Sequence, residues 1–163
     1  MRTLGLDYGS ARCGCALADP TGTIVTPIDA VARPATRRGL DALAALVVGH
    51  AVERVVVGLP LSLSGEESAQ TRETREFAGR LGRRLGEGVQ VELHDERLTT
   101  RMAQRMDGAQ TSEDSRAAAL MLESWLSTSP SAPDGGSWKG RHDGPASSSS
   151  SAGGSRREGG PWQ

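Results

Sequence analysis

With 163 residues and a formal net charge of −1, the chain has the length of one domain and lacks the strongly basic balance of a general nucleic-acid coat protein. No apolar run approaches the roughly 20 residues that a membrane-spanning helix needs, so we expect no membrane partner. Asp7 and Arg12 interrupt the first apolar segment, which is therefore unlike a secretory signal. These features together predict a cytoplasmic protein.

The composition changes near residue 128. Residues 1–128 hold nearly all the aliphatic side chains, whereas residues 129–163 are rich in Ser, Gly and Pro. Such a segment cannot bury enough apolar surface to offset the entropy lost on ordering. We therefore predict a folded domain over residues 1–128 and a disordered tail over residues 129–163. The tail has four basic and three acidic residues of the chain's 19 and 20, which leaves the predicted domain with a net charge of −2.

Three strands are predicted near the start of the chain. Residues 2–8 alternate between apolar and polar side chains, residues 13–18 form an apolar run, and a short strand begins over residues 22–25. Strands this close, joined by tight turns, predict an antiparallel meander. We expect Cys13 and Cys15 to be buried thiols on opposite faces of the second strand, unpaired as in a reducing compartment.

Helix and strand patterns then alternate along the chain. The predicted elements are a helix over residues 37–48, a doubly buried strand over 54–57, a helix over 67–85, a strand over 89–94, a short helix over 99–105 and a helix over 113–126. The order is therefore β-β-β-α-β-α-β-α-α. It predicts an α/β fold with a mixed five-stranded sheet and helices on both faces.

Three carboxylates stand at the ends of predicted elements. Asp7 lies at the end of the first strand, Glu96 follows the last strand, and Asp114 lies in the first turn of the last helix. The predicted topology can bring the first and last strands near one another and gather these acids at one rim of the sheet. Clustered carboxylates repel each other, and cations relieve that repulsion. Their oxygen atoms suit Mg²⁺ or Mn²⁺, and two such ions can activate water against a phosphodiester.

Each acid also has a simpler explanation. Asp7 could form a turn, Glu96 could pair with a nearby arginine on the surface, and Asp114 could stabilise the helix N-terminus through the helix dipole. The adjacent acids Asp95 and Glu113 are alternatives that the pattern alone does not separate. The functional interpretation depends on all three positions and the topology taken together.

Four residues near these acids are candidate substrate contacts. The small residues Gly9 and Ser10 would let a substrate backbone approach the end of the first strand. Arg12 and Arg97 have the forked guanidinium that clamps phosphate oxygens with two hydrogen bonds. The alternative for each arginine is an ordinary ion pair, such as Arg12 with Asp19.

Four motif blocks follow one another in the chain: LGLDYGSARCGCALADPTG, VVVGLPLSLSGEES, DERLTT and DSRAAALMLESWL. On these blocks, residues 2–127 resemble the YqgF/RuvX-type family of Holliday-junction-resolvase-like proteins, also described as pre-16S rRNA nucleases. The resemblance implies an RNase H-like fold with an acidic nuclease centre at Asp7, Glu96 and Asp114. It also implies a bacterial cytoplasmic role in processing the 5′ end of pre-16S rRNA, with pre-ribosomal particles as partners.

We therefore predict a hydrolase of ester bonds: an endonuclease that uses Mg²⁺ or Mn²⁺, two ions in all, acts on RNA in preference to DNA, and is a monomer or weak dimer. The segment over residues 101–113 is shorter and less basic than in the family, which weakens any substrate contact there. Three alternatives remain open: a Holliday-junction-type DNA resolvase, a kinase-like ATPase suggested by LGLDYGS, and a non-catalytic ribosome-assembly or RNA-binding factor.

Overall fold

The first three strands form an antiparallel meander. The computed structural model describes residues 1–62, 64–96 and 112–129. In it, β1 (Thr3–Tyr8) pairs with β2 (Arg12–Ala18), which pairs with β3 (Val25–Ala32). The β1–β2 turn is closed by the backbone N–H of Gly9, which donates to the carbonyl of Arg12 at 3.0 Å. The meander is therefore confirmed, but β3 begins at the end of the range 22–25 and is longer than predicted.

The rest of the sheet is parallel to β1. β4 (Arg54–Leu59) pairs with β1, and β5 (Gln90–Asp95) pairs with β4. The strand order is β3-β2-β1-β4-β5, which confirms a mixed five-stranded sheet. β1 and β5 are separated by one strand, and their carboxyl ends lie at the same edge of the sheet because both run parallel to β4.

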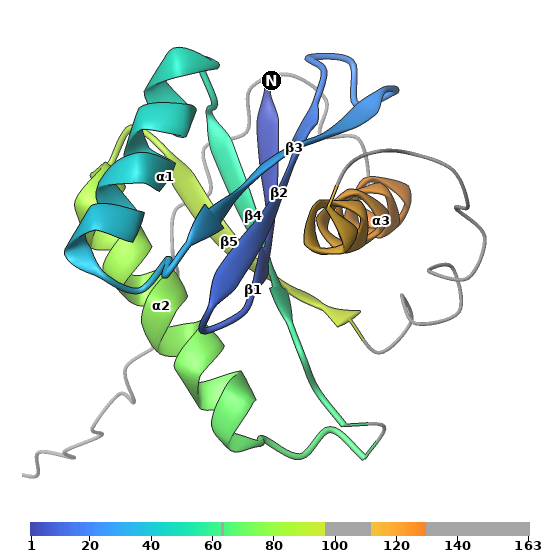
Figure 1. Ribbon diagram of the computed structural model, residues 1–163. Helices are drawn as coiled ribbons and strands as arrows, with labels where there is room; N and C mark the ends of the chain where they lie inside the picture. Colours follow the sequence, from blue (N-terminus) through green and yellow to red (C-terminus); the bar gives the residue numbers. More distant parts are fainter. Residues whose placement is uncertain (63, 97–111, 130–163) are drawn as a thin grey trace, which may run out of the picture. The chain divides into compact units, whose positions relative to one another are not determined.

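Helices cover both faces of the sheet (Figure 1). α1 (Arg37–Gly49) and α2 (Ala69–Leu85) pack on one face, and α3 (Glu113–Thr128) packs on the other. Side-chain hydroxyls of Thr36, Ser68 and Ser112 accept hydrogen bonds from the first-turn backbone of these helices. The cap at Ser68 explains why α2 starts two residues later than predicted. The predicted helix over residues 99–105 lies outside the described residues.

The core is divided by the sheet into two layers. The layer under α1 and α2 includes Leu6, Val57 and Phe77, all buried, and the layer under α3 is built on Val56 and Leu122. Alternation along a strand sends successive side chains to opposite faces. Leu6 therefore faces α1 and α2, and the next residue of β1 faces α3.

The expectation for the two cysteines is half wrong. Cys13 and Cys15 are buried, free thiols, as predicted. Both belong to the core layer under α1 and α2, so they share a face of β2. The reason is that side chains two residues apart in a strand point the same way.

Two glycines form the seat of α3 on the sheet. A methyl group at Gly5 would meet the Cβ of Leu122 at 2.9 Å, and one at Gly14 would overlap the backbone carbonyl of Asp114. Gly5 on β1 and Gly14 on β2 therefore let the helix backbone lie directly on the sheet. This close approach places the first turn of α3 against the end of β1 that carries Asp7.

Two further expectations concern the C-terminal tail and membrane-spanning helices. The tail predicted over residues 129–163 lies, apart from Ser129, outside the described residues, so the domain boundary stays a prediction. Among the described residues, none of the helices has the length and apolar character required to span a bilayer.

Replacing Gly14 with Ala tests the seat of α3. We expect a loss of about 3 kcal/mol in the free energy of unfolding, because backbone must move to admit the methyl group. Gly49→Ala is the matched control: a methyl group there meets nothing within 4 Å, and Ala is the better helix former. Urea denaturation of both variants measures the effect, and equal stability of Gly14→Ala and the unchanged protein would contradict this packing.

Candidate active site

Asp7 lies on the α3 face of the sheet near the carboxyl end of β1. It is paired in register with Gly14 of β2, the residue on which α3 rests. The carboxylate is partly buried. The side chain of Asp7 therefore lies between β1 and the first turn of α3.

Asp114 is brought to Asp7 by the anchoring of the α3 N-terminus. Ser112 caps the helix, and its hydroxyl accepts from the backbone N–H of Ser115 at 3.4 Å. The buried hydroxyl of Ser115 donates to the carbonyl of Ile28 on β3 at 2.6 Å. These hydrogen bonds fix the position of the first turn of α3. Because Gly14 has no side chain, the backbone of Asp114 packs directly against β2, and Asp114 is held beside the end of β1.

Glu96 follows β5 and lies over β4. A methyl group at Gly58 would overlap the Oε1 atom of Glu96, so the glycine makes room for this carboxylate. In register, Gly58 is opposite His94, whereas Leu59 is opposite Asp95. Alternation therefore places Glu96 on the α3 face with Asp7 and directs Asp95 to the other face.

The three predicted acids interact electrostatically. Burial, and then the charge of Asp114, raises the pKa of Asp7 above its ordinary value. Burial, and then the charges of Asp7 and Asp95, together raise the pKa of Glu96 to about 7. Asp7 is thus the central member of the group, since it is coupled to Asp114 on one side and to Glu96 on the other.

Arg12 supplies a positive charge at this centre. Its Nε atom lies 3.2 Å from Oδ2 of Asp114, so it pairs with that acid and not with Asp19. Asp19 instead accepts the backbone N–H groups of Thr23 and Ile24, each at 2.8 Å, in the β2–β3 turn.

The other predicted substrate contacts are Gly9, Ser10 and Arg97. Gly9 is required by the β1–β2 turn itself, because a methyl group there would lie 2.7 Å from the carbonyl of Arg12. Ser10 is exposed in the same turn. Arg97 lies outside the described residues. Of the four residues, Arg12 therefore contacts one of the acids, and Gly9 and Ser10 lie in the turn that follows Asp7.

The chemistry of the three acids suits a hard divalent cation, because all donors are carboxylate oxygens and their charges repel one another. Within residues 1–62, 64–96 and 112–129, however, no group of three His, Cys, Asp or Glu side chains is arranged to hold a metal ion. Asp114 is turned toward Arg12 in this structure. The predicted metal ligands therefore stay a prediction.

Sequence reasoning missed the two glycines that create the space for the site. Gly14 admits the backbone of Asp114, and Gly58 admits the side chain of Glu96. Each stands inside an apolar strand, in CGC and VVVGL. A glycine within a strand often marks a close approach by another part of the chain, so the signal was present.

Comparisons with known proteins identify a matching family and similar relatives. Residues 1–128 match the family described as "RuvX: Holliday junction resolvase". A "Putative pre-16S rRNA nuclease" of Anaeromyxobacter sp. (strain Fw109-5) is 42% identical over 134 residues, covering 77% of this chain and 96% of that protein. A protein of the same name from Mycobacterium leprae (strain TN) is 40% identical over 133 residues, covering 77% and 72%.

The fold is shared with a solved structure described as T. thermophilus RuvC in complex with Holliday junction substrate. The TM-score is 0.52, with 13% identity, over 78% of this chain and 98% of that chain. At this identity the likeness concerns the fold alone, and it confirms the predicted RNase H-like architecture.

Glu96→Gln tests the electrostatic account of the site. The folded pKa of Glu96, about 7, is above its ordinary 4.5, so the unfolded chain releases this proton first and the protein loses stability as pH rises through that window. In chelator, we expect Glu96→Gln to stabilise the protein by about 2 kcal/mol at pH 8 and much less at pH 5.

Urea denaturation across this pH range measures the difference. Glu87→Gln, at an exposed position after α2, removes the same charge and serves as the control. A constant difference between Glu96→Gln and the unchanged protein at all pH values would refute the coupling.

Proposed function

This chain belongs to the RuvX family, and on that basis we propose that it is a divalent-metal-dependent nuclease whose catalytic centre consists of Asp7, Glu96 and Asp114. The prediction of this family from four sequence motifs is confirmed by the family match and by the named relatives. A hydrolase acting on phosphodiester bonds follows from that membership. The residue roles, the metal and the substrate are the proposal.

The convergence of three acids on one end of the sheet carries the proposal. Asp7, Glu96 and Asp114 come from three different elements, and burial, followed by the charges of neighbouring carboxylates, raises the pKa values of Asp7 and Glu96. The repulsion between these carboxylates makes the folded protein less stable, and yet the fold keeps the three acids together. Perturbed acids gathered in this way are typical of catalytic sites.

Mg²⁺ or Mn²⁺ would be held by the same three carboxylates, two ions in all. When bound, the ions supply an activated water and stabilise the leaving oxygen of the phosphodiester. The carboxylates of Asp7 and Glu96 orient the site, and binding neutralises the charges that now repel. Asp114 would exchange its ion pair with Arg12 for this role.

Arg12, released from Asp114, is placed to hold a phosphate oxygen of the substrate. Its side chain is 66% exposed, so a ligand can reach it. The small residues Gly9 and Ser10 leave the neighbouring turn open to a nucleic-acid backbone. Arg97, the residue after Glu96 in the sequence, would add a second guanidinium.

The substrate we propose is the 5′ region of pre-16S rRNA, reached within pre-ribosomal particles in the bacterial cytoplasm. The names of the relatives support it, since both proteins described above are called pre-16S rRNA nucleases. The enzyme would act as an endonuclease and as a monomer or weak dimer. Residues 1–128 would form the nuclease domain, and residues 129–163 a disordered tail.

A four-way DNA junction is the second candidate substrate. The family description names Holliday junction resolvases, and the solved structure with a similar fold contains such a junction. The two substrates share the phosphodiester on which the acids would act. Only the surfaces around the acids can distinguish RNA from branched DNA.

Asp7→Asn tests the catalytic proposal. We expect metal-dependent cleavage by the unchanged protein and a loss of about a thousandfold in the variant, because the central carboxylate is removed. Pre-16S leader RNA, unrelated single-stranded RNA and a four-way DNA junction are each incubated with Mg²⁺ or Mn²⁺. Product lengths on denaturing gels give the rate and the substrate.

Glu87→Gln is the matched control, since Glu87 is an exposed acid that precedes β5, at the opposite end of that strand from Glu96. It should cleave at the unchanged rate. Cleavage by Asp7→Asn at that same rate, or the absence of metal-dependent cleavage of any substrate, would defeat the proposal. Cleavage of the junction alone would favour the second candidate.

A further inference from the structure

Arginines gather where β3 ends and α1 begins. Arg33, Arg37 and Arg38 are all exposed. Arg33 has a positive backbone φ of 45° and donates its N–H to the carbonyl of Ala11 at 2.9 Å. The carbonyl of Arg33 accepts from the hydroxyl of Thr36 at 2.8 Å. The turn that carries these arginines is therefore held in one conformation.

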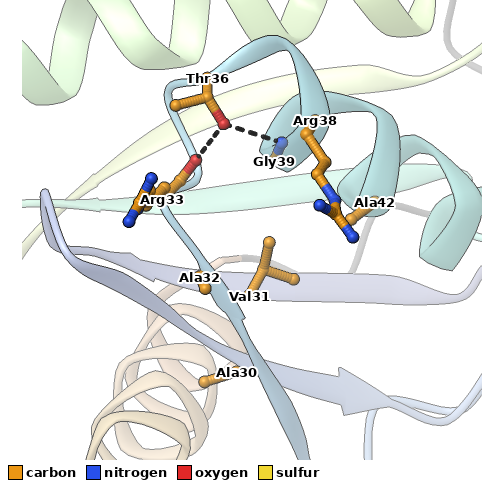
Figure 2. Close-up of a pocket in the computed structure, with 8 residues that line it drawn as sticks. All are labelled: Ala30, Val31, Ala32, Arg33, Thr36, Arg38, Gly39 and Ala42. Carbon is orange, nitrogen blue, oxygen red and sulfur yellow. Dashed lines mark hydrogen bonds between the residues drawn. The ribbon is translucent and has the colours of Figure 1, made fainter.

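A pocket of about 790 Å³ lies beside this turn (Figure 2). Figure 2 shows Arg38 extending from α1 toward Val31 of β3, with the small side chain of Ala42 beside it on the same helix. The lining residues are Ala30, Val31, Ala32, Arg33, Thr36, Arg38, Gly39 and Ala42. The charged groups of this lining are two guanidiniums, so the pocket suits an anion.

These positive charges have no carboxylate partner within the described part of the chain. None of Arg33, Arg37 and Arg38 forms an ion pair there. The first turn of α1 contains no acid, and the acid that follows it, Asp41, is paired with Arg84 at 2.8 Å. Cations that neighbour one another in the first turn of a helix repel each other and oppose the helix dipole. A bound anion would relieve both effects.

The pocket is connected to the acidic centre through the β1–β2 turn. Arg33 is hydrogen-bonded to Ala11, and the next residue, Arg12, is paired with Asp114. Arg12 lies on the α3 face, whereas Val31 and Arg38 lie on the α1 side. Arg12, Arg33 and Arg38 therefore form a row. It begins beside the acids, passes around the end of the sheet and ends at the edge formed by β3.

We propose that this pocket binds backbone phosphate of a single-stranded nucleic-acid segment leading away from the bond at the acidic centre. The proposal rests on the proposed function for its direction: the same strand would pass Arg12 and then reach Arg33 and Arg38. Guanidiniums bind phosphate oxygens with paired hydrogen bonds. The row of arginines compensates for a chain whose net charge is −1.

Two variants of the full chain change the pocket in different ways. The double variant Arg33→Gln/Arg38→Gln removes its charges, and Ala42→Glu adds a carboxylate at an exposed position of its wall. Val48→Glu is the control, because it adds the same charge on the same helix at a side chain that is 81% exposed and outside the lining. Circular dichroism and thermal unfolding establish that each variant is folded.

Binding of a fluorescently labelled single-stranded RNA, and of single-stranded DNA of the same sequence, is measured by anisotropy in chelator. We expect the dissociation constant to rise about tenfold in both pocket variants and to stay unchanged in Val48→Glu. The slope of log binding constant against log salt should fall by roughly 1 in the double variant, since each phosphate contact on a single strand contributes about 0.7. In cleavage assays with metal, KM should rise while kcat is retained.

The outcomes separate this proposal from the nuclease proposal. If the pocket variants bind both oligonucleotides as tightly as Val48→Glu, the pocket proposal is overturned, even where the unchanged protein cleaves. The same follows if the unchanged protein binds neither oligonucleotide. If binding weakens in the pocket variants but no substrate is cleaved, the pocket binds nucleic acid and the nuclease proposal alone fails. Equal effects on RNA and DNA indicate phosphate recognition without contacts to the 2′-hydroxyl, and effects on RNA alone indicate that the hydroxyl is also contacted.

Discussion

The contact of α3 with β1 and β2 is the constraint on which the site depends. Without side chains at Gly5 and Gly14, the helix backbone lies directly on the sheet. The buried hydroxyl of Ser115 then bonds to the carbonyl of Ile28, so the first turn of the helix has one position. Asp114 therefore meets Asp7 because of backbone packing, and not because the two acids attract each other.

Charge repulsion is the cost of this arrangement. Burial and neighbouring carboxylates raise the pKa values of Asp7 and Glu96, and Arg12 offsets part of the excess by pairing with Asp114. A cation at the centre would remove the remaining repulsion and free Arg12 for a phosphate. The arginine at the site and those at the β3–α1 junction then form one positively charged row beside a negative centre, which is the pattern that a polyanionic substrate requires.

The sequence was sufficient for the sheet type and for the order of the elements among the described residues. Apolar spacing identified α1, α2 and α3, and the run over residues 54–57 identified β4, an interior strand of the sheet. The start of β3 was misplaced, because the turn that Asp19 stabilises reaches Ile24. Cys13 and Cys15 were predicted on opposite faces of β2, but residues two apart in a strand share a face, as these two do. The seat at Gly14 depends on Asp114, a residue distant in sequence, so local patterns could signal a close approach there without identifying its partner.

The central claim is that Asp7, Glu96 and Asp114 hold metal together. The most direct test is anomalous scattering from crystals soaked in Mn²⁺, which locates the ions without reference to activity. The account predicts a manganese peak in contact with carboxylate oxygens of all three residues, and a change of partner for Asp114 away from Arg12. A peak held by other acids, such as Asp95 or Glu113, or no peak at this end of the sheet, would contradict it.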